Sequence, residues 1–279
     1  MSESTVASPS PSPQAARPAA GVPGGRRPGR RRLRTALIAA SVVGLFLLWL
    51  WGSTFFADYI LPPPAMVWES FVSMLERGTW GTEILATLQH MFTAFALILA
   101  VGLPAGIVIG RLWMAEDLSR VPLIFLQTVP TVVLIALALI FIGTNSTGVV
   151  AVTVASGLPY FMLNVIQGTK AIDYDLMEMG RAYGAGERRL MRSIVLPSVV
   201  PYFLAGGRVT LGVAWQVTLF GEYLMGTPGV GFQISSAIKL LDTASVFAWG
   251  LSIVALTIAF EYGIFRPVEA YLTRHTRRG

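Results

Sequence analysis

Residues 178–197 read EMGRAYGAGERRLMRSIVLP and lie between two long apolar runs, at 147–168 and 198–225. The segment is charged and compatible with a helix, but Gly184 and Gly186 interrupt it, and glycine readily ends a helix in a left-handed turn. Pro197 lacks a backbone donor and is expected to set a new helix start. The sequence therefore predicts a charged helical segment, broken at the glycine pair and held at a membrane surface.

The composition of the chain indicates an apolar solvent. Of its 279 residues, 54% are hydrophobic and 13% are charged, whereas soluble domains carry about 25% charged residues. Cysteine is absent and the histidines are limited to His90 and His275, which excludes a disulfide framework, a thiolate metal site and a centre with several histidines. The net charge of +6 comes from basic residues beside apolar runs. That pattern is typical of membrane topology and anionic lipid, not of a surface that reads nucleic acid.

Apolar runs long enough to cross a bilayer, about 20 residues each, recur along the chain. They lie at 36–56, 84–110, 119–142, 147–168, 198–225 and 244–265. Proline interrupts three of them, at Pro104, Pro130 and Pro159, which membrane helices tolerate where neighbours satisfy the freed carbonyl groups. The sequence predicts an all-α integral membrane protein with about six transmembrane helices. The first helix is expected at 35–57 and the core of the protein at 58–272.

The first 34 residues are rich in Ser, Pro, Ala, Gly and Arg and are expected to form a disordered basic tail. A basic stretch before an apolar run is also the layout of a secretory or twin-arginine signal. The run that follows is about long enough for a full span, and no convincing small-residue cleavage site comes after it. A retained first helix is therefore favoured.

The placement of Lys and Arg predicts the side of the membrane on which each segment lies. The tail, the loops at 111–120 and 168–193, and the basic end at 273–279 hold most of these residues, whereas the opposite segments hold only Arg77 and Lys239. By the positive-inside rule, both termini and the 168–193 loop are cytoplasmic in a multi-pass protein of the cell inner or plasma membrane. Segments 61–77 and 226–243 then lie outside. We expect the former to hold a short amphipathic interfacial helix.

A polar stripe on the fifth span is a candidate route for a solute. Glu222 lies deep in that span, and ionisable groups in membrane helices usually face a cavity or a partner. Helical spacing places Thr218, Trp215 and Arg208 on the same face as Glu222. We predict that these four residues line a translocation pathway. The alternative is that Arg208 and Glu222 extend to the two interfaces as anchors.

Motifs for catalysis are missing from the sequence. It contains no G-x-S-x-G, H-E-x-x-H or paired-carboxylate motif. The Gly-rich stretch GTPGVG at 226–231 lacks the Lys and Ser/Thr of a phosphate-binding loop. We therefore expect no enzyme activity, no cofactor, no metal site and no ATP site in this chain.

Several stretches resemble one transporter family. Within residues 178–197, the residues Glu178, Gly184, Ile194, Leu196 and Pro197 fall at the spacing of the signature loop of binding-protein-dependent ABC importer permeases, although Met179 and Gly180 replace its two alanines. Further matching stretches are LPPPAMVWESF (61–71), PLIFLQTVP (122–130), FGEYL around Glu222 and GVGFQISSA (229–237). From about residue 61 to 271, the chain is similar to permeases of the nitrate/sulfonate/taurine transporter family.

This resemblance implies a type I ABC importer permease fold and a non-catalytic subunit. In the family, the signature loop forms two short helices with a Gly turn and docks on a cytoplasmic ATPase. Here that implies a cytoplasmic coupling loop at 168–197, with ATP bound and hydrolysed by the partner. The loop residues so implicated are Glu178, Arg181, Gly184, Ala185, Arg188, Ile194, Leu196 and Pro197.

The implied partners are a cytoplasmic ABC ATPase dimer, an extracytoplasmic or lipid-anchored solute-binding protein, a second permease copy and the lipid bilayer, with no nucleic acid. A homodimer is favoured, and a heterodimer with another permease remains open. The implied solute is small, such as a sulfonate, nitrate or bicarbonate. A stand-alone secondary transporter or channel is the alternative function, but it predicts internal inverted repeats, which the sequence does not display. A membrane-embedded enzyme is disfavoured by the missing catalytic sets.

Overall fold

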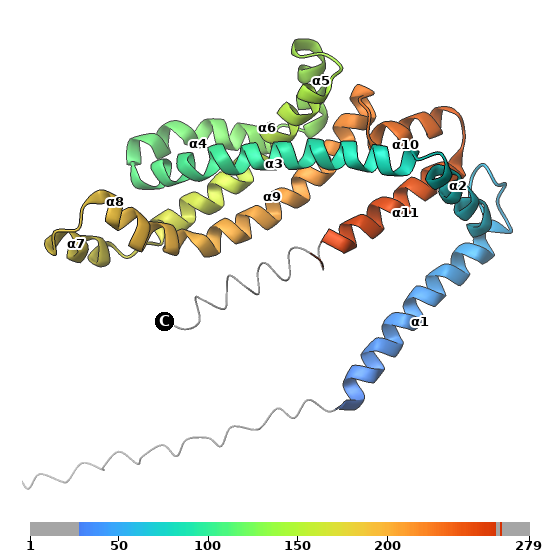
Figure 1. The fold of residues 1–279 in the computed structure, drawn as a ribbon, viewed down its shortest axis with the longest axis horizontal. Coiled ribbons are helices and arrows are strands. Elements are labelled where there is room, and N and C mark those ends of the chain that lie inside the picture. Colours follow the sequence, from blue (N-terminus) through green and yellow to red (C-terminus); the bar gives the residue numbers. More distant parts are fainter. Residues whose placement is uncertain (1–27, 261–262, 264–279) are drawn as a thin grey trace, which may run out of the picture. The chain divides into compact units, whose positions relative to one another are not determined.

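The computed structural model describes residues 28–260 and residue 263, and the regular structure in this part of the chain is helical (Figure 1). The chain divides into two compact units, Met1–Leu48 and Trp49–Gly279. The predicted basic end at 273–279 and residues 1–27 of the predicted tail lie outside the described residues.

The first unit is described by helix α1, which spans Pro28–Ser53 and continues past the unit boundary. The helix begins at Pro28, within the predicted tail, and so before the start expected for the transmembrane helix at residue 35. Its stretch Ala36–Ser53 is long and apolar enough to cross a membrane. Side chains from Ala36 to Leu48 are exposed, as expected for a helix whose solvent is lipid.

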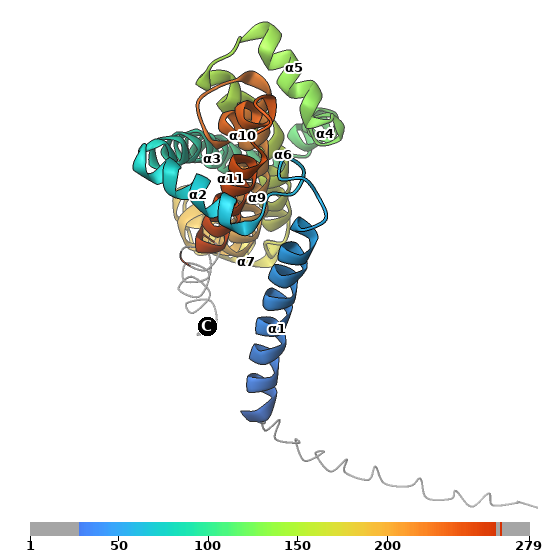
Figure 2. The same cartoon turned by 90° about the vertical axis from the view of Figure 1, so that its right-hand side faces the viewer.

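Three long helices form the centre of the second unit: α3 (Thr79–Arg111), α6 (Ser146–Lys170) and α9 (Leu196–Met225). Helix α6 packs against both α3 and α9 along most of its length (Figures 1 and 2). Glycines make this close packing possible, because a Cβ atom at Gly106 would lie 2.7 Å from Cγ1 of Val165. The Asn145 side chain caps the start of α6 by accepting the N–H of Gly148 at 2.9 Å.

The run predicted as one span at 119–142 is two helices. Helix α4 (Trp113–Thr128) and helix α5 (Thr131–Phe141) meet at an angle of 99°. The break falls at Val129 and Pro130. Proline has no N–H to continue a helix, and it holds the residue before it in extended backbone. Pro104 and Pro159, by contrast, lie inside continuous helices. The described part of the chain thus has five candidate spans, or six if α4 and α5 form one broken span.

Two shorter helices, α2 (Pro64–Glu76) and α10 (Val230–Lys239), lie at one end of the second unit, and both pack against the candidate span α11 (Thr243–Phe260). The expected short helix in 61–77 is therefore present as α2, and its buried side chains Val67 and Met74 pack in a core with Ile84, Val230 and Trp249. Helix α10 is too short to cross a bilayer, at about 1.5 Å of rise per residue.

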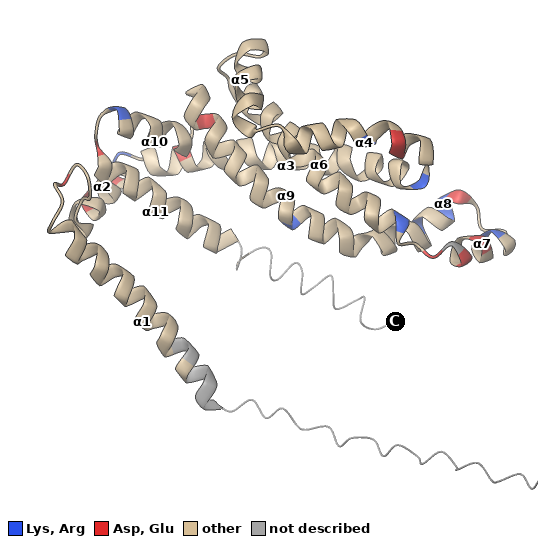
Figure 3. Cartoon of the chain, turned by 180° about the vertical axis from the view of Figure 1, so that it is seen from behind, with Lys and Arg blue, Asp and Glu red and all other residues tan. Residues whose placement is uncertain are grey.

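Charged side chains of the second unit gather at its two ends (Figure 3). One end carries α7 (Tyr174–Ala182), α8 (Glu187–Leu190) and the start of α4, and the other carries α2 and α10. The long middle of the helices between these ends is nearly free of charge. This arrangement fits a membrane layer between two aqueous surfaces.

Candidate functional site

The segment 173–197 forms the short helix α7 (Tyr174–Ala182), a glycine turn, and α8 (Glu187–Leu190), which is the first turn of the helix that continues into α9. The Asp173 carboxylate caps α7 by accepting the N–H of Asp175 at 2.9 Å. Gly184 has φ +76°, a left-handed conformation that favours glycine, and its N–H donates to the Arg181 carbonyl at 2.9 Å. The predicted break at the glycine pair is confirmed. Gly184 makes the turn, and Gly186, with φ −67°, precedes α8.

Pro197 lies in the first turn of the α-helix α9, as predicted, but α9 continues directly from the helix before it. The helix runs without a break from Glu187 to Met225, through a π-helical turn at Met191–Val195. In this turn, the Leu196 N–H donates to the Met191 carbonyl, five residues earlier. The wider turn comes just before the residue that lacks a donor, so the chain can pass Pro197 and stay helical.

The α7–α8 pair is anchored to the long helices through an apolar core. Met177 of α7, Leu190 of α8 and Val195 of the π-turn are buried with Ile107 of α3 and Val165 of α6. Leu190 also explains one departure from the family signature. A Cβ atom at Gly180, where the signature has alanine, would lie 2.5 Å from Cδ2 of Leu190. The larger leucine thus fills the space that an alanine methyl would need.

Glu187 ties the same segment together by charge. Its carboxylate accepts from Arg181 Nε and Nη2 at 3.2 and 3.0 Å, and from Arg111 Nη2 at 3.1 Å. The hydrogen bonds from Arg181, which has the larger effect, and from Arg111 lower the pKa of this exposed carboxyl. Arg111 is the last residue of α3, so the contact joins the loop to a span. Lys170, at the end of α6, forms a further ion pair with Glu116 of α4.

The side chains that the sequence assigned to this loop divide into two groups. Arg181, Arg188 and Glu178 are exposed, as are Gly184, Leu196 and Pro197, whereas Ala185 and Ile194 pack against the apolar core. The loop also presents exposed apolar side chains that the sequence analysis did not single out: Tyr183 is 87% exposed and Met179 is 53% exposed. Tyr183 directly precedes the signature glycine Gly184, and this position was the signal available in the sequence.

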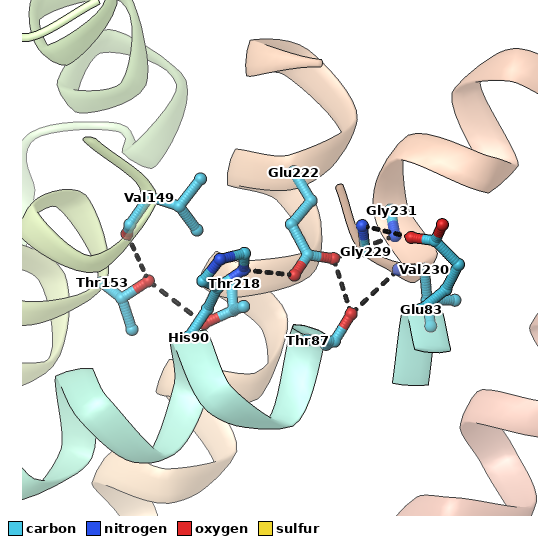
Figure 4. Close-up of polar contacts among 10 residues, drawn as sticks. All are labelled: Glu83, Thr87, His90, Val149, Thr153, Thr218, Glu222, Gly229, Val230 and Gly231. Carbon is cyan, nitrogen blue, oxygen red and sulfur yellow. Dashed lines mark hydrogen bonds and ion pairs between the residues drawn. The ribbon is translucent and has the colours of Figure 1, made fainter. Parts of the chain in front are cut away.

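Glu222 and Thr218 of the predicted pathway lie inside the protein, not on an open face (Figure 4). Both residues are fully buried. Glu222 Oε1 contacts His90 Nδ1 at 2.9 Å, and its Oε2 accepts from the Thr87 hydroxyl at 2.8 Å and from the Gly231 N–H at 3.1 Å. The Thr218 and Thr153 hydroxyls lie 3.2 Å apart.

Arg208 and Trp215 have a different environment. They line a groove of 210 Å³ with Leu211, Gly212, Gln216, Thr257 and Phe260. Arg208 and Gln216 are exposed, and the Trp215 ring lies 6.2 Å from that of Phe260. The four residues therefore do not share one exposed face in this structure, because Arg208 is exposed whereas Thr218 and Glu222 are buried. Helical spacing places the four at similar angles around α9, but α3 and α10 cover the part of α9 that carries Glu222.

Gln216 and Thr257 were missed by the sequence analysis. Gln216 follows Arg208 and Gly212 at intervals of four residues, so helical spacing could have identified it. No sequence pattern marked Thr257 of α11 as a site residue, because only the packing of the helices brings it to the groove. Within the described residues, no group of three or more His, Cys, Asp or Glu side chains could hold a metal ion.

Comparison with known proteins identifies this arrangement. Residues 102–263 match the model of a family described as "Binding-protein-dependent transport system inner membrane component". The chain is 26% identical over 221 residues to the taurine transport system permease protein TauC of Escherichia coli (strain K12), covering 76% of this chain and 79% of that protein. It is 29% identical over 233 residues to the riboflavin transport system permease protein RibX of Chloroflexus aurantiacus, covering 82% and 86%.

A solved structure of the MetNI methionine ABC transporter, in an inward-facing conformation, has a similar fold. The TM-score is 0.59 at 19% sequence identity, over 71% of this chain and 96% of that chain. The predicted fold class and the resemblance based on residues 178–197 are confirmed. The two curated relatives are named for different solutes, taurine and riboflavin.

Proposed function

We infer that this chain, which belongs to the family of binding-protein-dependent transport system inner membrane components, forms the solute route of an ATP-driven importer and is moved by a cytoplasmic ATPase. The observation that carries this proposal is the α7–α8 pair. It is a compact, exposed helix pair whose buried side is joined to the cores of α3, α6 and α9. An element of this kind can receive a displacement at its surface and pass it to the spans.

The surface of the pair fits a protein partner. Tyr183 and Met179 expose apolar area on a segment that is otherwise charged, and aromatic side chains often dominate the binding energy of interfaces. Arg181 is held by Glu187, so part of the charged surface is ordered before binding. We propose that an ATPase subunit binds this surface, that it binds and hydrolyses the ATP, and that this chain has no catalytic role.

The coupling then follows from the contacts within the chain. ATP-driven closure of an ATPase dimer would displace the α7–α8 pair. Met177 and Leu190 would transmit that displacement to the packed core, and Glu187 would transmit it to the end of α3 through Arg111. Packed interfaces tend to have discrete alternative arrangements, so a small shift at the docking surface can reorient whole helices.

We propose that the α9–α11 groove with Arg208, Trp215 and Gln216 lines part of the solute route. Charged and amide groups facing hydrocarbon are costly, so an exposed face that carries them is better explained by water or a second permease copy than by lipid. The chain supplies one coupling loop, whereas an ATPase dimer offers two docking sites, which favours a homodimer. We further propose cytoplasmic termini, an external solute-binding protein as partner, and a small solute such as a sulfonate.

Tyr183→Ala tests the docking surface. We expect this variant to reach the membrane at the normal level, but to retain less ATPase on purification and to support less uptake, because it removes exposed aromatic area without disturbing the core. Phe141→Ala is the matched control. Phe141 is 81% exposed at the end of α5, away from α7 and α8 (Figure 1). Undiminished ATPase retention and uptake in Tyr183→Ala would contradict this docking surface.

A further inference from the structure

Three successive backbone N–H groups at the start of α10 are held by side chains of the long helices (Figure 4). The N–H of Gly229 donates to Glu83 Oε2 at 2.7 Å, that of Val230 to Thr87 Oγ1 at 2.9 Å, and that of Gly231 to Glu222 Oε2 at 3.1 Å. Glu83 and Thr87 belong to α3, and Glu222 belongs to α9. We call these three acceptor side chains the latch. The latch fastens the turn at 226–231 to two spans at once.

Glu222 is the centre of the latch. Its side chain is fully buried, and its two oxygens accept from Thr87 and Gly231 and contact His90. A buried carboxylate is tolerated only with such partners, and removal of one partner leaves polar groups buried and unpaired. The Thr87 hydroxyl donates to Glu222 and accepts from Val230, so it joins the carboxylate to the turn. Loss of this one hydroxyl weakens both contacts.

The turn has a backbone that fits only when glycine is present. Gly229 has φ +146°, and a Cβ atom there would overlap the carboxyl group of Glu222. A Cβ atom at Gly231 would overlap the carbonyl oxygen of Leu219. The stretch GVG thus brings the backbone directly onto the buried carboxylate. The hydrogen bonds of the turn and the absence of side chains at Gly229 and Gly231 both allow the backbone to lie directly against Glu222.

Both flanks of α10 carry an energetic cost in this conformation. The Thr227 hydroxyl is buried without a hydrogen-bond partner among the described residues, which is unfavourable. Beyond the other end of α10, Leu241 has φ +56°. A left-handed conformation at a residue other than glycine is also unfavourable. Costs of this kind persist only where other contacts impose them, and they are frequent at elements that move.

We propose that α10 and the 226–231 turn form a lid over the predicted outer end of the solute route, and that the latch holds this lid closed until the ATPase is loaded with ATP. Glu222 is then a positioning residue for the lid and does not contact the solute. The lid's place in a transport cycle rests on the proposed function. The latch itself is defined by the contacts and can be tested without any solute.

Single cysteines in this Cys-free chain provide the test. Ser235, on α10, is buried, and Leu240, just after α10, is 79% exposed. The full importer in right-side-out vesicles is treated with a membrane-impermeant maleimide, either free of nucleotide or trapped with ATP and vanadate. We expect Ser235→Cys to react slowly without nucleotide and at least tenfold faster when trapped. Leu240→Cys should react readily in both states.

The latch is tested in the Ser235→Cys background with Thr87→Val, which keeps the side-chain shape and removes the hydroxyl. We expect fast labelling in both nucleotide states, whereas Thr87→Ser should restore slow labelling without nucleotide. Glu83 also accepts from Gln233 Nε2, at 3.0 Å. Glu83→Gln leaves one carbonyl oxygen for these two donors and should also speed labelling. Continued protection of Ser235→Cys in both Thr87→Val and Glu83→Gln overturns the latch. Equal labelling with and without trapped ATP in the otherwise unaltered chain overturns the moving lid.

Failure of the proposed function would look different. If the ATPase does not co-purify, the importer assignment fails, while the effect of Thr87→Val on labelling without nucleotide still tests the latch. If Leu240→Cys reacts only from the opposite side of the membrane, the predicted topology fails and the lid does not lie at the outer end. That result overturns the proposed location.

Discussion

The turn at Gly184 provides the sharpest test of the coupling loop. Gly184 has φ +76° and no heavy atom within 4 Å of the position that a Cβ atom would occupy. Replacement by alanine therefore causes no clash with a neighbouring residue, and its cost is that of the left-handed backbone alone. That cost is about 1–2 kcal/mol for a residue with a Cβ atom.

An alanine at this position shifts the loop toward conformations without the left-handed turn. A free-energy change of 1–2 kcal/mol alters a population ratio by a factor of about 5–30. The apparent affinity for a partner falls with the fraction of molecules that are competent to bind. We therefore expect Gly184→Ala to weaken ATPase binding by up to about 30-fold.

The measurement is a titration of the ATPase dimer onto the permease in lipid nanodiscs. Gly186→Ala is the matched control, because Gly186 lies two residues away with φ −67° and equally open space. It should leave the Kd unchanged. Gly184→Asn should lose less affinity than Gly184→Ala, because asparagine enters the left-handed region more readily than most residues. Equal Kd values for Gly184→Ala and Gly186→Ala would refute the reasoning.

Three further predictions follow from the structure. Gly106→Ala should destabilise the packing of α3 on α6 by about 1–3 kcal/mol, because the added methyl group overpacks the contact. Gly81→Ala, in an open position of the same helix, should not. Thermal unfolding in detergent compares the two variants, and equal melting temperatures would contradict the close approach of α3 and α6. A cysteine at Gln216 should react with a small hydrophilic thiol reagent and one at Thr218 should be protected, and the reverse order would refute the proposed groove. Glu187→Gln should increase the mobility of the α7–α8 pair, because it weakens the contacts of this side chain with Arg181 and Arg111. A spin label at Arg188 measures this mobility, and an unchanged value would contradict a role of the Glu187 ion pairs in holding the pair.

The lid has a bearing on the interpretation of Glu222. A carboxylate in the middle of an apolar sequence suggests contact with a transported solute. In the structure its two oxygens are engaged by the hydroxyl of Thr87, the ring of His90 and the backbone of Gly231. If Glu222 acts through these contacts, substitutions at Glu222 and Thr87 should have similar effects on the labelling of a cysteine at Ser235 in the lid, whatever solute is offered.

Local features of the sequence were sufficient for several conclusions. Hydropathy located the membrane helices, because a run of about 20 apolar residues is stable only in an apolar layer. The glycine pair predicted the break between α7 and α8, because backbone freedom at Gly184 depends on the residue itself. The proline at 130 predicted an interruption, although the bend of 99° and the division into α4 and α5 depend on packing against α6.

Tertiary structure alone decided which polar residues are buried and which are open. Periodicity gives the angle of a side chain around its helix, but it does not say which neighbours cover that part of the helix axis. Arg208 and Glu222 lie at similar angles on α9, yet one is exposed beside α11 and the other is buried under α3 and α10. The contact of Glu187 with Arg111 likewise joins residues far apart in the chain. Such contacts depend on how the helices pack in three dimensions, and no pattern within a single helix contains that information.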